Sequence, residues 1–158
     1  MPVSAYLLAK GFSSMLFGTV ILLMMGACAV LLGGVNLPVG AWLKLLAVVT
    51  LGSIPFCLMG LLVAFLVPPQ GAPGIMNLIN LPLAFAAGLW LPVEMLPKAF
   101  RTIAPALPQY HICQLALKAV GAAPPGDVSW HVTMLLAATI VFGTASWFAW
   151  RRSDATAT

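Results

Sequence analysis

The chain is 158 residues long, and only 6% of its residues are charged, whereas 62% are hydrophobic. Ordinary soluble domains carry about a quarter charged residues, so a water-soluble core this apolar would have no polar shell to cover it. The net charge is +4, but the seven Lys and Arg residues are mostly scattered singly. This pattern excludes the clustered cationic face that a nucleic-acid partner requires.

Long apolar segments set the fold class. The longest run without a charged residue covers the 49 residues between Lys44 and Glu94, and Pro and Gly cluster in its middle, at residues 67–74. About 20 apolar residues cross a bilayer core of roughly 30 Å, so this run predicts a membrane hairpin. With two further charge-free runs, we predict four transmembrane helices, at approximately residues 12–33, 41–67, 73–92 and 129–150.

The predicted fold class is all-α integral membrane. Backbone groups in lipid must be satisfied internally, which leaves helices or closed barrels. The apolar runs lack the alternation of apolar and polar residues that is typical of barrel strands. Four helical spans place both ends of the chain on the same side of the bilayer.

The connection at residues 93–128 is the long polar-containing segment of the sequence. Apolar residues at 112, 115, 116 and 119 follow helical spacing, and polar residues at 111, 114 and 118 occupy the opposite face. This predicts an amphipathic helix at about residues 109–120. Because 12 residues cannot span a bilayer, we expect an interfacial or re-entrant helix, preceded by a shorter one at about residues 97–104.

Asn77 and Asn80 lie three positions apart on one face of the third predicted span. Polar groups at membrane depth tend to face a bundle interior or a cavity, so these side chains could line a substrate path. Alternatively, they hydrogen-bond a neighbouring helix as structural contacts. We favour the contact between helices.

Polar residues of the connection are candidates for a solvated rim at the mouth of the third span. Glu94 follows the third span and Lys98 comes four residues later, a spacing that suits a solvated surface pair. The candidate rim residues are Glu94, Lys98, Arg101, Tyr110 and His111.

His111, Cys113 and His131 are conceivable metal ligands. Zinc needs three or four convergent ligands, and the two faces of a helix would separate His111 from Cys113. No metal site and no catalytic or cofactor-binding residue is therefore predicted.

The order of motifs from residue 88 to residue 121 is distinctive. An apolar span ends in a Gly-x-x-x-Pro turn, a second Pro follows, and a Leu-Pro pair precedes an aromatic residue and the amphipathic helix. These features are carried by Gly88, Pro92, Leu96, Pro97, Leu107, Pro108 and Tyr110. The segment resembles the region before the last span in ABC transporter permeases of the type-2 exporter class, and residues 52–65 and 75–83 look like that family's two preceding spans.

The resemblance implies that residues 1–158 form part of a permease transmembrane domain. That domain usually has six spans, and the four predicted here correspond to the last four, so the chain is either a fragment or is completed by another polypeptide. The resemblance further implies a multi-pass protein of the inner or plasma membrane, with cytoplasmic termini and an extracytoplasmic segment at residues 93–128. It also implies a permease dimer that works with separate ATP-binding cassette ATPase subunits.

The sequence lacks the phosphate-cradling loop GxxxxGK[ST], so ATP is expected on a partner subunit and no cofactor on this chain. We therefore predict the permease subunit, or a fragment of it, of an ATP-driven exporter, and not an enzyme. Because no charged residue lies deep in a span, a hydrophobic or amphiphilic substrate is favoured. The alternatives are a passive channel or structural scaffold and, more remotely, an intramembrane enzyme, although Glu94, Asp127 and Asp154 all lie outside the spans.

Overall fold

The computed structural model describes residues 3–123 and 126–156. Within these residues all regular structure is helical, which confirms the predicted all-α class. Along the chain the α-helices are α1 (Val3–Leu31), α2 (Val39–Gly52), α3 (Ile54–Leu66), α4 (Ala72–Ala86), α5 (Lys98–Ile103), α6 (Pro108–Ala119) and α7 (Val128–Thr156), and two short 3-10 helices are η1 (Val93–Met95) and η2 (Ala104–Ala106).

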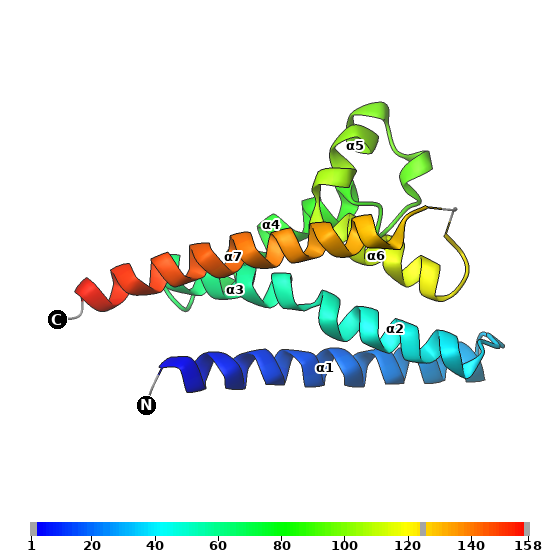
Figure 1. Ribbon diagram of the computed structural model, residues 1–158, viewed down its shortest axis with the longest axis horizontal. Helices are drawn as coiled ribbons and strands as arrows, with labels where there is room; N and C mark the ends of the chain where they lie inside the picture. Colours follow the sequence, from blue (N-terminus) through cyan, green and yellow to red (C-terminus); the bar gives the residue numbers. More distant parts are fainter. Residues whose placement is uncertain (1–2, 124–125, 157–158) are drawn as a thin grey trace.

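Three helical stretches of the described chain are long and apolar enough to cross a membrane: Gly11–Leu31, Val39–Leu66 and Val128–Arg152. In Figure 1, α1, the α2–α3 pair and α7 run along the long axis of the molecule, and α5 and α6 gather with η1 and η2 toward one end. The start of α1 and the end of α7 lie at the opposite end. The chain is therefore a multi-pass membrane protein.

The predicted span at residues 41–67 is broken at Ser53. Pro55 has no backbone N–H to donate to the preceding turn, and its ring interferes with the helical carbonyl four residues earlier. At the interruption the Ser53 hydroxyl donates to the Thr50 carbonyl over 2.8 Å. The helix restarts there, with the Phe56 N–H donating to the Ser53 carbonyl over 3.1 Å.

The third predicted span, at residues 73–92, is also corrected. Its helix, α4, ends at Ala86 after 15 residues, which is about 22 Å of helix against a bilayer core of roughly 30 Å. The following residues are not helical until η1. Irregular backbone is tolerated near membrane depth only where protein or water satisfies it, and here part of it is satisfied by the turn after α4, in which the Leu89 N–H donates to the Ala84 carbonyl.

The helices are joined by a few close contacts. The Ser146 hydroxyl of α7 donates to the Leu58 carbonyl of α3 over 2.9 Å, and Ser146 is buried. Between α1 and α2, the hydroxyls of Thr19 and Thr50 lie 3.4 Å apart. Such polar contacts and small residues hold helices together in lipid, where apolar packing alone gives little preference for protein over lipid.

The outer surface of α1 is apolar. Phe12 and Phe17 are 71% and 68% exposed, and Met25 is 68% exposed. In water such a surface would be an aggregation liability, whereas lipid tails are its natural solvent. The exposure of α1 therefore agrees with a membrane location.

Candidate functional site

The turn after α4 is fixed by Gly88, which has a φ of +82°. The Leu89 N–H donates to the Ala84 carbonyl and the Gly88 N–H to the Phe85 carbonyl, both over 3.1 Å. This is a Schellman motif, in which glycine at the left-handed position ends a helix. A Cβ at Gly88 would also collide with the Val93 side chain, so a residue with a side chain does not fit at this position.

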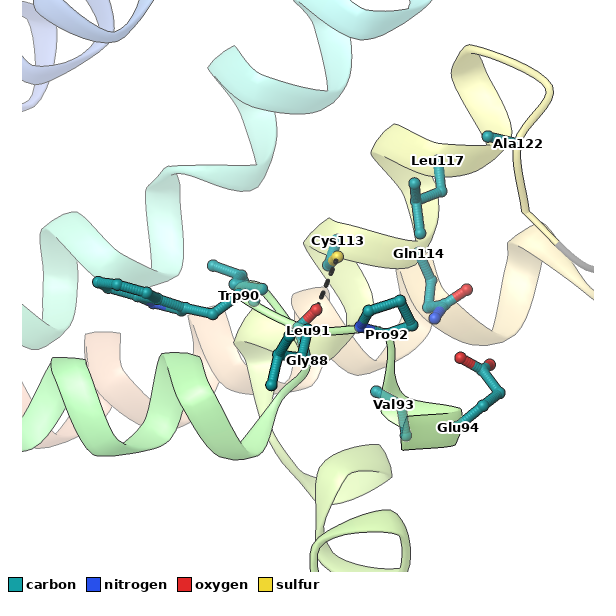
Figure 2. A pocket seen from close by; sticks show the side chains of 11 residues that line it. Gly88, Trp90, Leu91, Pro92, Val93, Glu94, Cys113, Gln114, Leu117 and Ala122 are labelled. Atoms are coloured by element: carbon teal, nitrogen blue, oxygen red, sulfur yellow. Dashed lines mark hydrogen bonds between the residues drawn. The ribbon is translucent and has the colours of Figure 1, made fainter. Parts of the chain in front are cut away.

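The turn forms one wall of a pocket of about 350 Å³ between residues 88–94 and α6. Figure 2 shows Gly88, Pro92 and Glu94 on one side of it and Cys113, Gln114 and Leu117 on the other. The Cys113 thiol lies 4.0 Å from the Gly88 carbonyl, a long sulfur contact that joins the two walls. The pocket thus combines apolar walls with a carboxylate and an amide.

The short helix α5, which precedes α6, packs against α4. The ring of Phe100 in α5 meets that of Phe85 in α4 edge to face, with centroids 6.1 Å apart. Leu96 and Ala104, which precede and follow α5, are buried, at 3% and 0% exposure. The predicted interfacial helices at residues 97–104 and 109–120 correspond to α5 with η2 and to α6, and their bounds differ by one or two residues.

The polar face of α6 is buried, which the amphipathic pattern did not indicate. Gln109, His111 and Gln114 are exposed by only 2%, 1% and 8%. The candidate rim is accordingly divided: Glu94, Lys98 and Arg101 are exposed, but Tyr110 is half-buried. His111 is buried, because α6 packs this part of its polar face against α7 and η2.

Asn80 makes a contact between helices. Gln109 of α6 donates from Nε2 to Oδ1 of Asn80 over 3.1 Å. The Gln109 Oε1 is a buried acceptor for which the described residues provide no donor, and such atoms usually bind water or an approaching group. Asn77 is exposed and has no hydrogen-bond partner among the described residues.

Two histidines meet between α6 and α7. Nδ1 of His111 lies 2.9 Å from Nδ1 of His131, and Nε2 of His111 lies 2.9 Å from the carbonyl oxygen of Pro105 in η2. His131, in the first turn of α7, is 7% exposed. Burial lowers the pKa of His111, an effect that its hydrogen bond to Pro105 partly opposes. No group of three metal-ligating side chains occurs among the described residues.

A second polar pocket of about 350 Å³ opens beside this pair, and Gln114 lines it as well as the first. Burial raises the pKa of Tyr110 in its wall, and the charges of Glu94 and Cys113 add to that rise. Burial likewise raises the pKa of the Cys113 thiol. At neutral pH both groups therefore carry their protons, so Tyr110 in this pocket and Cys113 in the first act as neutral hydrogen-bonding groups.

Asp127 closes this pocket next to α7 and caps the helix. Its carboxylate accepts from the Ser129 hydroxyl over 2.8 Å and from the Ser129 N–H over 3.0 Å. These two bonds hold the pKa of Asp127 below its ordinary value. Lys118 donates to the Gly126 carbonyl over 2.9 Å, so α6 is also tied to the chain that enters α7.

An apolar groove lies beside α6. It measures about 400 Å³ and is bounded by α2, α3, α6 and α7. Nearly all its lining is hydrocarbon, with Leu51, Leu115 and Leu136 among its walls. Leu51 and Leu136 are 63% and 57% exposed, so the groove opens on the outer surface of the helix bundle.

Sequence reasoning missed the roles of His131, Gln109 and Gln114. The helical face shared by Gln114 and His111 was visible in the sequence, but its burial was not. The pairing of His131 with His111 has no local signal, since 20 residues separate them.

The fold and this site define a class: a multi-pass α-helical membrane protein in which a packed polar segment separates a short apolar helix from the last span. The profile of the family described as "ABC-2 family transporter protein" matches residues 1–148, and the chain belongs to this family. This confirms the resemblance found in the sequence.

A similar protein is YvfS of Bacillus subtilis (strain 168), whose assigned name is that of a transport permease. It is 30% identical over 105 residues, which cover 66% of this chain and 42% of YvfS. The match thus spans less than half the length of that relative. No solved structure matches the chain.

Proposed function

We propose that this chain is the membrane-spanning part of an ATP-driven exporter of the plasma membrane, working as a permease dimer with separate ATP-binding cassette ATPase subunits. The observation that carries the proposal is the family match over residues 1–148. The name of YvfS supports the same role. The sequence has no phosphate-cradling loop, so nucleotide hydrolysis is assigned to a partner, and this chain performs no covalent chemistry.

The proposed substrate is hydrophobic or amphiphilic. The apolar groove between α2, α3, α6 and α7 offers hydrocarbon walls, and the polar pockets around α6 offer hydrogen-bonding groups a short distance along the same helix. A molecule with an apolar body and a polar end would place its body in the groove and its polar end in one of the pockets. Charged side chains deep in the bilayer, which are typical of ion pathways, are missing from the three described spans.

Reconstitution tests the proposal. The full chain is co-expressed with an ATPase subunit that carries GxxxxGK[ST], co-purified and placed in liposomes with a fluorescent phospholipid analogue. We expect co-purification and ATP-dependent movement of the analogue. Movement should stop when the Lys of the partner's phosphate-cradling loop is replaced by Ala, which is the matched control.

The rival functions give different results. A passive channel would let small ions or dyes equilibrate with or without ATP, and a scaffold would move nothing under either condition. Movement of small inorganic ions alone would contradict the proposed substrate class. Failure of every ATPase subunit to co-purify with the chain would contradict the exporter.

A further inference from the structure

The contact between His111 and His131 is unusual because both rings are buried and present the same atom to each other. Each ring uses Nδ1, and the two nitrogens lie 2.9 Å apart. The exposed fractions of the two side chains are 1% and 7%. These are also the only two histidines of the sequence, so no other side chain has an ordinary pKa near 6.5.

The hydrogen bonds fix where the protons lie. The Pro105 carbonyl can only accept, so Nε2 of His111 carries a hydrogen and donates to it. A neutral His111 then has a bare Nδ1, which can only accept. Nδ1 of His131 must therefore carry a hydrogen and donate it to Nδ1 of His111.

This arrangement limits how many extra protons the pair can hold. A first proton can bind Nε2 of His131, because that leaves both hydrogen bonds intact and gives the His131 donor a charge, which strengthens its bond. A second proton would have to bind Nδ1 of His111. Two N–H groups would then face each other at 2.9 Å, each on a positive ring, and the contact could not persist.

Few other charges face the pair. Tyr110 of α6 lies against both rings, with centroids 5.3 Å from His111 and 5.9 Å from His131. Lys118 of α6 and Asp127 before α7 are within electrostatic reach of His131. Glu94 of η1 acts on Tyr110, whereas η2 contributes only its carbonyl.

We propose that His111 and His131 form a one-proton latch that holds α6 against α7 while the pair binds no or one extra proton, and that a second proton releases α6. Because α6 carries walls of both polar pockets, release changes access to them. The latch responds to the pH of the compartment that the interfacial segment faces, and it does not depend on the proposed transport function.

The direction of the effect follows from burial. Burial lowers the pKa of His111, so the unfolded chain binds protons more readily than the native state as the pH falls below about 6.5. Acidification therefore weakens the contact, and raising the pH restores it.

Hydrogen–deuterium exchange tests the latch in the full chain in lipid nanodiscs, without ATPase or substrate. We expect exchange of α6 amides, corrected for intrinsic rates, to rise about tenfold or more between pH 7.5 and pH 4.5, as when a net stabilising contact is lost. Exchange of α3 amides should not change. Because Asp and Glu, with ordinary pKa values near 4, begin to bind protons at the acidic end of this window, a histidine variant is needed to assign the response.

His131→Asn removes the second ring while keeping a contact. The Asn amide can donate to a neutral His111 or turn its oxygen toward a protonated one, so α6 exchange should rise much less on acidification than in the native protein, with only the burial of His111 left to oppose its protonation. The matched variant Asp127→Asn keeps both histidines and a capping side chain. Its response should persist but shift to lower pH, because a nearby negative charge is lost.

Ring-nitrogen NMR of histidine-labelled protein gives a second measurement that needs no variant. At pH 7.5 the hydrogen should lie on Nε2 of His111 and on Nδ1 of His131. The proposal is overturned if His111 carries its hydrogen on Nδ1, if native α6 exchange is the same at both pH values, or if His131→Asn responds as the native protein does.

Discussion

Gln109 of α6 donates a hydrogen bond of 3.1 Å to Asn80 of α4, joining the short apolar helix to the interfacial segment. Replacing Asn80 by Ala should destabilise the protein by about 1–2 kcal/mol, because the buried Gln109 amide would lose its partner. A double-mutant cycle with Gln109→Ala should give a coupling of about 1 kcal/mol. Thermal unfolding in detergent measures both.

Asn77→Ala is the matched control, because Asn77 is exposed on the same helix, as Asn80 is, but has no hydrogen-bond partner among the described residues. Its effect should stay within about 0.5 kcal/mol. Equal losses for the two Asn variants would show that the Gln109 bond contributes nothing specific.

The turn at Gly88 should not tolerate a side chain. Gly88 and Gly121 both end helices with positive φ, +82° and +75°, but only at Gly88 would a Cβ meet the Val93 side chain. Gly121→Ala should destabilise the protein by about 1–2 kcal/mol, because alanine is strained in the left-handed backbone conformation. Gly88→Ala should destabilise it more, because the collision with Val93 adds to that strain.

Combining Gly88→Ala with Val93→Ala should recover part of the difference, since the colliding methyl group is removed. Unfolding midpoints of the variants provide the comparison. If Gly88→Ala and Gly121→Ala unfold alike, the close approach of Val93 is not a constraint.

Gly52 lets α6 approach the break between α2 and α3. A Cβ at this position would lie 2.7 Å from Cδ1 of Ile112. Gly52→Ala should therefore destabilise the protein by about 1–3 kcal/mol through overpacking. The double variant with Ile112→Ala should be more stable than the sum of the two single effects predicts.

Gly40→Ala serves as its control, because Gly40 lies in the same helix with open space around it. There alanine should be neutral or stabilise α2 by up to about 1 kcal/mol. If Gly40→Ala destabilises the protein as much as Gly52→Ala does, the effect at Gly52 does not come from overpacking against Ile112.

Asp127 gives a second pH dependence, in a more acidic range than the histidines. The bonds from Ser129 lower its pKa, so its contribution to stability is complete above the ordinary carboxyl pKa near 3.9 and is lost as the pH falls through the lowered value. Exchange of the first-turn amides of α7 should rise only below about pH 4. Asp127→Ala should show raised exchange at every pH, and Asp127→Asn much less, because Asn also caps helices.

Cysteine labelling tests the proposed orientation. In a background without Cys28, Cys57 and Cys113, a cysteine placed at Lys98 or Asp127 should react with an impermeant reagent added outside intact cells. A cysteine at Ser153 should react only after the cells are opened. The opposite pattern would reverse the proposed orientation.

The sequence by itself determined the fold class, the family and the approximate positions of the long helices. The physical reason is that a bilayer demands an uninterrupted apolar length from each spanning helix, and that demand is local in sequence. Residues 12–33 and 129–150 were found in this way, and the order of turns from Gly88 to Tyr110 indicated the family.

Local signals also marked two features that the apolar length concealed. Pro55 removes a backbone donor in mid-helix, and Gly88 provides the left-handed position that ends α4 six residues before the predicted boundary. Counting the length of an apolar run treats Pro55 and Gly88 as ordinary apolar residues, so it predicts neither the helix break nor the early helix end.

Only the tertiary structure decided which side chains meet. Ser146 reaches Leu58 across 88 positions of the chain, and Gln109 reaches Asn80 across 29. The burial of His111 beside His131 depends on how α6 and α7 pack, and the polarity of α6 alone favoured an exposed face. Such contacts depend on the relative placement of helices, which the periodicity of a single helix does not contain.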